Sequence, residues 1–189
     1  MTNLDNLFTH IKSNDLLASA RAGGHLPIYI YSYPPAQEDE MMKCLAGCRS
    51  NLIAEGKTVI HIDLFDLVVN VLKKEGELEK LLEIESQVDK WEVADHINSV
   101  ADFSEVVIPE ILKETDDLPP AVVFLSGIGK CYPFLRTAKI MNGLETGLSD
   151  TPVVLFFPGN YDGWTMLLFG SVPEHTYRGI NLSGQLNKE

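Results

Sequence analysis

The sequence has little of what would place it outside the ordinary globular proteins. It has three cysteines with no paired spacing, so a disulfide framework is excluded and reduced thiols in a cytoplasmic protein are expected. No apolar run approaches the roughly 20 residues that a membrane-spanning helix requires. The first 25 residues carry Asp5 and Asp15 instead of the basic start and apolar middle of a signal peptide. Only 14 of the 189 residues are glycine and 10 are proline, which excludes collagen-like and disordered chains.

The motifs of common nucleotide-binding and metal-dependent enzymes are also absent. Gly56-Lys57-Thr58 has Asn51 where a phosphate-binding loop needs a glycine, and it runs from a helix into a strand rather than the reverse. Cys44 and Cys48 lie four residues apart on one expected helix face, but no second His or Cys pair completes a zinc site, which favours core packing. No nucleophile elbow, zinc-protease motif or dinucleotide fingerprint occurs. We therefore expect no metal, no cofactor and no catalytic residue set.

Positive charge is scarce, and the deficit lies in one segment. The chain has 15 Lys and Arg against 27 Asp and Glu, a net charge of −12. Residues 75–117 hold fourteen acidic residues and three lysines, a balance of −11, so the other 146 residues together carry −1. Because DNA binding is driven by neutralisation of phosphates, we expect no direct non-specific DNA binding. The ordinary interpretation of the acidic segment is a solvated helical surface, and the sharper one is a docking face for a basic partner.

The pattern of apolar residues predicts an α/β fold. Runs rich in β-branched and aromatic residues predict strands over 26–33, 58–65, 121–127 and 151–159. Apolar residues at helical spacing predict helices ahead of the first strand, over 38–55, in a short stretch ending near Gly76, within 75–117, and from Pro133 onward. This alternation is typical of three layers, with a mainly parallel sheet flanked by helices.

The remaining segments complete the expected architecture. The short segments 164–170 and 175–182 follow tight turns, so we expect them to add antiparallel edge strands at the C-terminal end of the chain. The acidic helices fall between the second and third strands, where a large crossover insert would lie. We therefore expect one α/β domain over 1–189 with an acidic helical insert at about 75–117.

The loops at the carboxyl ends of the strands hold the candidate site, because ligands of open α/β sheets bind there. They combine cations and aromatic side chains, and aromatic residues with arginine are enriched at binding hot spots. Tyr161 is expected at the tip of a turn and exposed. The candidate interaction or anion-binding site comprises Lys130, Tyr132, Arg136, Lys139, Tyr161, Asp162 and Arg178.

Asp63 and Asp66, at the end of the second strand, are the best carboxylate pair in the sequence. Two carboxylates at this position could bind a divalent ion or serve a hydrolase. The stronger alternative is that Asp66 caps the helix that begins beside it. His61, alternate to Asp63 on the strand, is then expected to face packed side chains.

The sequence also resembles the BrxB family of BREX bacteriophage-defence systems. The resemblance covers nearly the whole chain and rests on four segments in this order: HIDLFDLVVNVLKKEG, VVFLSGIGKCYPFLRTAKIMNGLE, TPVVLFFPGNYDGWTMLLFG and TYRGINL. Its most specific parts are YPFLR, from Tyr132 to Arg136, and FFPGNYDG, from Phe156 to Gly163. The implied fold is like a P-loop nucleoside triphosphatase or Rossmann core without a Walker A loop, because YSYPPAQEDE stands after the first strand.

The resemblance implies one component of a multi-protein defence system that methylates host DNA and blocks replication of unmodified phage. No catalytic residue set is established for the family, so none is carried over. We therefore expect a non-enzymatic core or adaptor subunit that contacts other BREX proteins, first of all the PglZ-type member of the alkaline-phosphatase superfamily. The alternatives are a nucleotide- or anion-binding module at Lys130 and Arg136, or an unrecognised hydrolase that uses Asp63 and Asp66.

Overall fold

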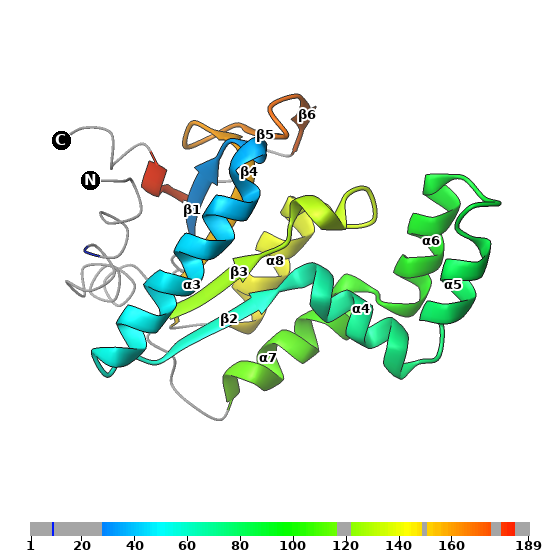
Figure 1. The fold of residues 1–189 in the computed structure, drawn as a ribbon, viewed down its shortest axis with the longest axis horizontal. Helices are drawn as coiled ribbons and strands as arrows, with labels where there is room; N and C mark the ends of the chain where they lie inside the picture. Colours follow the sequence, from blue (N-terminus) through cyan, green and yellow to red (C-terminus); the bar gives the residue numbers. More distant parts are fainter. Residues whose placement is uncertain (1–8, 10–27, 117–121, 149–150, 175–178, 184–189) are drawn as a thin grey trace.

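The structure is a computed structural model, and it describes residues 9, 28–116, 122–148, 151–174 and 179–183 (Figure 1). The helices expected ahead of the first strand, and Arg178 of the candidate site, lie outside the described residues. Within the described ranges, no helix is both long enough and apolar enough to cross a membrane.

The centre of the fold is a parallel sheet with the strand order β2-β3-β4-β1-β7. Its strands are β1 (Ile28–Tyr33), β2 (Val59–Asp63), β3 (Val122–Ser126), β4 (Val153–Tyr161) and β7 (Ile180–Asn181). All five residues of β3 are buried, as expected for a parallel strand covered on both faces. The predicted α/β class with a mainly parallel sheet is therefore confirmed.

The C-terminal edge differs from the prediction in one strand. β5 (Met166–Leu168) pairs antiparallel with the end of β4, as expected, and β6 (Val172–Pro173) pairs antiparallel with β5. The segment 175–182 instead contributes β7, which runs parallel to β1. The prediction was wrong for this segment because the two-residue β6 takes the place beside β5, whereas Ile180 and Asn181 pair with β1 at the edge of the parallel sheet.

Helices cover both faces of the sheet (Figure 1). On one face, α3 (Glu38–Ala54) packs Met41, Leu45, Cys48 and Leu52 against every second residue of β1. On the other face lie α4 (Leu64–Lys74), α7 (Ile108–Asp116) and α8 (Thr137–Gly147). The side chains of β1 alternate between the two cores, because successive residues of a strand point to opposite faces.

The acidic segment is helical and connects β2 to β3. After α4 it forms α5 (Leu78–Ile84), α6 (Lys90–Val100), the π-helical turn η2 (Phe103–Val107) and α7. Asp89 and Asp102 cap α6 and η2, each accepting hydrogen bonds from two backbone N–H groups. Figure 1 shows α5 and α6 beyond α4, at the end of the molecule away from α3.

The helix expected from Pro133 begins later. Gly129–Cys131 forms the 3-10 turn η3, residues 132–136 form a loop that contains a cis Tyr132–Pro133 peptide bond, and α8 starts at Thr137. Proline suits the first turn of a helix, but it suits a loop equally well, so it does not by itself place a helix start. In this loop Leu135 is buried in the core, while Tyr132 and Phe134 are half-buried.

Tyr161 is buried, not exposed as predicted, with 6% of its surface accessible. Its hydroxyl donates to the carbonyl oxygen of Gly179 and accepts from the N–H of Gly179, both at 2.9 Å. Asn181 donates its side-chain amide to the carbonyl oxygen of Tyr161 at 2.8 Å. The prediction was wrong because β4 extends through Tyr161, and the turn forms one residue later, around the side chain of Asp162.

Tyr161→Phe is expected to reduce the free energy of unfolding by about 1–3 kcal/mol, because both backbone groups of Gly179 lose a partially buried hydrogen-bond partner. The measurement is urea unfolding followed by circular dichroism. The matched control is Tyr132→Phe, since the Tyr132 hydroxyl makes no hydrogen bond to a described residue. We expect the control to change stability by less than about 0.5 kcal/mol. Equal midpoints for the two variants would contradict the structural role assigned to Tyr161.

Candidate functional site

Asp63 organises the carboxyl edge of the sheet where β2 ends. Its Oδ1 accepts from the backbone N–H groups of Phe65 and Asp66, at 3.0 and 3.2 Å. Asp63 is therefore the residue that caps α4, and the prediction that Asp66 does so was wrong. Asp63 has extended backbone angles and directly precedes the first helical residue, as a cap must, whereas Asp66 is already inside the first turn.

The second oxygen of Asp63 faces the loop after β3. Oδ2 lies 3.1 Å from Nζ of Lys130 and 3.5 Å from Oγ of Ser126. Between these two residues, Gly127 has a φ of 77°, and a β-carbon there would overlap the Asp63 carboxylate. Glycine is thus required at this position twice over, for its backbone conformation and for the space that the carboxylate fills.

His61 completes this cluster on the β2 side. Its Nε2 lies 2.8 Å from Oγ of Ser126, so this half-buried side chain makes a specific polar contact that the sequence did not predict. Burial lowers the pKa of His61, and the nearby Asp63 charge only partly offsets this. Ser126 has no accessible surface, and both oxygens of Asp63 are engaged. The cluster therefore joins two strands and a helix, and its hydroxyl is not accessible to a substrate.

The two central cations of the predicted site are already paired. Lys130 contacts Asp63, and Arg136 Nη1 lies 3.2 Å from Oε1 of Glu174. The other oxygen of Glu174 accepts from the backbone N–H of Thr137, so this buried carboxylate occupies the N-terminus of α8. Sequence reasoning missed Glu174, because a contact between residues 37 positions apart leaves no local signal.

The other members of the predicted site are spread over this edge. The Arg136 guanidinium lies over the ring of Tyr132 at 5.2 Å, and that ring meets Phe169 edge-on at 6.2 Å. Asp162 is exposed, and its pKa is lowered by hydrogen bonds from the backbone N–H groups of Thr165 and Trp164. Lys139 is exposed on α8. The structure brings Lys130, Tyr132 and Arg136 onto one loop but leaves little unpaired positive charge there.

The loop after β1 is poorly suited to phosphate. Pro34 and Pro35 have no N–H to donate, and the Tyr33 hydroxyl donates to Oε2 of Glu38 at 2.6 Å. The first turn of α3 carries three carboxylates, at Glu38, Asp39 and Glu40. A phosphate at this position would meet negative charge instead of backbone donors. Among the described residues, no group of three or more His, Cys, Asp or Glu side chains could hold a metal ion.

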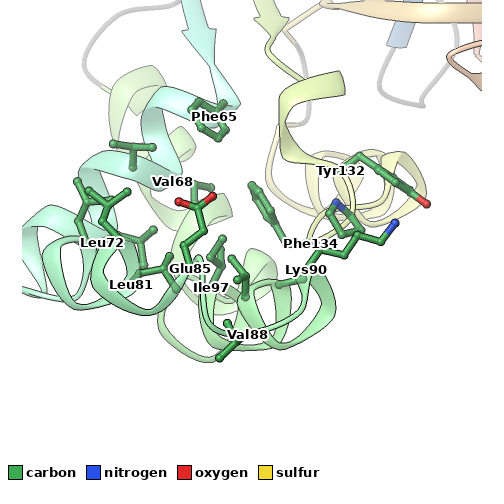
Figure 2. Close-up of a pocket in the computed structure, with 16 residues that line it drawn as sticks. Phe65, Val68, Leu72, Leu81, Glu85, Val88, Lys90, Ile97, Tyr132 and Phe134 are labelled. Atoms are coloured by element: carbon green, nitrogen blue, oxygen red, sulfur yellow. The ribbon is translucent and has the colours of Figure 1, made fainter.

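A second concave site lies between the acidic insert and the loop that contains Tyr132. It is an apolar groove with a volume of about 520 Å³, and Phe134 faces Val68 and Ile97 across it (Figure 2). Of the residues that line it, only Glu85 and Lys90 are charged. The rest of its lining comes from α4, α5, the turn between α5 and α6, α6 and the loop: Phe65, Val68, Val69, Leu72, Leu78, Leu81, Leu82, Val88, Val93, Ala94, Ile97, Tyr132, Pro133 and Phe134.

The groove exists because α5 and α6 are covered on one side only. Leu81, Ala94 and Ile97 are buried, whereas Leu82 is 59% exposed and Trp91 is 49% exposed. The apolar stripes on these helices resemble those of core helices, so sequence reasoning identified the stripes without showing that part of them stays uncovered. The high share of apolar residues in the seven-residue α5 was the signal in the sequence that part of this helix stays uncovered.

The groove and the edge cluster both lie in a region that matches a known family. The family model described as "BREX protein BrxB" matches residues 60–182. A "BREX protein BrxB" from Bacillus cereus (strain H3081.97) is 26% identical over 181 residues, covering 92% of this chain and 92% of its own length. Another from Escherichia coli O9:H4 (strain HS) is 24% identical over 186 residues, covering 95% of this chain and 89% of its own length. No solved structure matches the chain significantly.

The partly buried position of His61 predicts a dependence of stability on pH. Because burial lowers its pKa below the ordinary value of 6.5, the unfolded chain binds the proton more readily than the folded chain. The stabilising contribution is fully present above about pH 6.5 and is lost as the pH falls below it. We expect the free energy of unfolding to fall more steeply between pH 7 and pH 5 in the unmodified protein than in His61→Gln. Parallel curves from urea titrations at each pH would show that His61 is not buried in its neutral form.

Proposed function

Because the chain belongs to the BrxB family of BREX proteins, which supports a role in phage defence, we propose that it is a non-enzymatic adaptor subunit that joins other BREX proteins. The observation that carries this proposal is the apolar groove between the acidic insert and the loop of Tyr132–Phe134. A partner protein is the ligand class that such a surface suits best, since large uncovered apolar surfaces mark interaction sites on soluble proteins.

The exposed apolar side chains support this assignment. Six large apolar side chains are exposed among the described residues, and three of them, Leu82, Ile84 and Trp91, belong to the acidic insert. Tryptophan is among the residues most enriched at binding hot spots. The insert thus combines an uncovered apolar surface with a high negative charge, which favours a specific protein contact over a purely solvated surface.

The carboxyl edge of the sheet supports the adaptor proposal because its groups are poorly suited to the two alternative functions. Lys130 and Arg136 are each paired with a carboxylate of the same chain, so an anion would have to compete with Asp63 and Glu174. The hydroxyl of Ser126 is buried and is not accessible to a substrate. No specific observation at this edge favours nucleotide binding or hydrolysis.

Among BREX proteins, the PglZ-type member of the alkaline-phosphatase superfamily is the first partner we propose, because the family resemblance favours it. The negative charge of the acidic insert indicates which kind of surface on that partner it would contact. A protein with a net negative face repels acidic surfaces and attracts basic ones at short range. The contact on the partner is therefore proposed to lie on a positively charged region.

The test is affinity purification of the tagged, full-length chain from cells that express the whole BREX operon. We expect at least one other BREX protein to be recovered in stoichiometric amount, and Mg-ATP to leave the melting temperature of the isolated chain unchanged. A ligand at 100 times its Kd would stabilise the fold by about 2.7 kcal/mol, which is a shift of several degrees. Recovery of the chain alone would overturn the adaptor proposal, and such a shift in Mg-ATP would then favour a nucleotide-binding module.

A further inference from the structure

We infer that the groove receives an amphipathic helix of the partner, with apolar residues on the buried face and lysine or arginine on the flanking faces. This inference rests on the proposed function and specifies the chemistry of the partner.

The lining of the groove suits a helix better than a small ligand. Small-molecule sites place a few polar groups among apolar ones to fix the orientation of the ligand. Here the two charged side chains, Glu85 and Lys90, are both exposed. Apart from the hydroxyl group of Tyr132, every other lining side chain is wholly apolar. Helix-binding grooves have this composition, because they accept apolar side chains at positions i, i+3, i+4 and i+7 of the bound helix.

The charge around the groove is negative and largely unneutralised. Residues 75–102 contain nine acidic residues and two lysines, a balance of −7. Glu77 is paired with Lys80 at 2.6 Å. Five other carboxylates of α5, α6 and the turn between them are exposed, make no ion pair with a described residue and cap no helix with their side chains: Glu79, Glu83, Glu85, Glu92 and Asp95.

The unpaired carboxylates flank the apolar lining of the groove. On α5, Glu79 and Glu83 directly follow the lining residues Leu78 and Leu82 in the sequence. A helix that buries its apolar face here would therefore present its neighbouring side chains to carboxylates. Lysine or arginine at those positions would relieve the repulsion within the insert and direct the approach of the partner.

The same charge argues against a second copy of this chain as the occupant. Two copies that met through this face would bring two segments of −7 against each other. Like charges across an interface disfavour association, and Lys80 and Lys90 are too few to balance the nine acidic residues that each copy would bring. A basic partner helix satisfies both the apolar lining and the charge.

The experiment uses the isolated full-length chain and a synthetic peptide of about 18 residues, long enough for five helical turns. The peptide carries leucine at i, i+3, i+4 and i+7 spacing, lysine elsewhere and a fluorescent label, and binding is followed by fluorescence anisotropy. One control peptide has the same composition in an order without an apolar face, and the other has glutamate in place of lysine. We expect the first peptide to bind at least tenfold more tightly than either control.

Two pairs of variants separate the groove from the rest of the surface. Leu82→Arg introduces a cation at the groove, and Ile53→Arg is the matched control, because Ile53 is 46% exposed on α3. Glu85→Lys reverses the charge of a residue that lines the groove. Its matched control, Glu114→Lys, makes the same change in the last turn of α7, which does not line the groove. We expect both groove variants to raise the Kd of the basic peptide at least tenfold, and both controls to change it less than threefold.

Three outcomes would overturn the inference. Equal binding of the ordered and scrambled basic peptides would show attraction by charge alone. Equal weakening by Leu82→Arg and Ile53→Arg would place the binding surface elsewhere. A concentration-dependent dimer of the unmodified chain that Leu82→Arg dissociates, measured by analytical ultracentrifugation, would make a second copy the occupant of the groove.

The affinity purification from operon-expressing cells distinguishes this inference from the proposed function. If Leu82→Arg recovers the same BREX proteins as the unmodified chain, the adaptor proposal stands and the groove is not the contact surface. If the unmodified chain recovers none, the adaptor proposal fails, while the peptide titration still decides the chemistry of the groove. Loss of the partner from Leu82→Arg but not from Ile53→Arg supports both.

Discussion

The carboxylate of Asp63 is the contact on which the arrangement of both candidate sites depends. One of its oxygens caps α4, the other pairs with Lys130, and its side chain fills the space that any residue larger than glycine would need at position 127. The Asp63 side chain is only 10% exposed, so removal of Lys130 would leave a poorly solvated charge at the end of β2. α4 and the loop of residues 132–136, which follows the turn that contains Lys130, form two walls of the groove, and the contacts of Asp63 anchor both.

A second ion pair fixes the other end of the same loop. Arg136 contacts Glu174, and Glu174 also accepts from the first turn of α8. Between the two ion pairs Leu135 enters the core, so the loop can expose only a short stretch of apolar surface. Tyr132, Pro133 and Phe134 are that stretch, and they line the groove. The cations that the sequence placed in an interaction or anion-binding site thus hold the loop that forms one side of the apolar groove.

The sequence predicted the features that depend on neighbours along the chain, and it failed for those that depend on distant partners. The strands β3 and β4 and the helix α3 were predicted correctly, because burial on both faces or on one stripe leaves a continuous apolar pattern. The burial of Tyr161 depends on Gly179, and the pairing of Arg136 depends on Glu174, so neither was visible in local patterns. The groove was missed for a related reason, since a stripe of leucines does not show whether another element covers it.

The most direct test of the account is amide hydrogen exchange, measured for the isolated chain and for its complex purified from operon-expressing cells. Slower exchange on complex formation reports the surface that the partner covers. If the partner binds in the groove, exchange becomes slower over α5, α6 and residues 132–134, with no change over the β5–β6 hairpin at the carboxyl edge of the sheet. Protection confined to that hairpin and the loop after β4, with α5 and α6 unchanged, would contradict it.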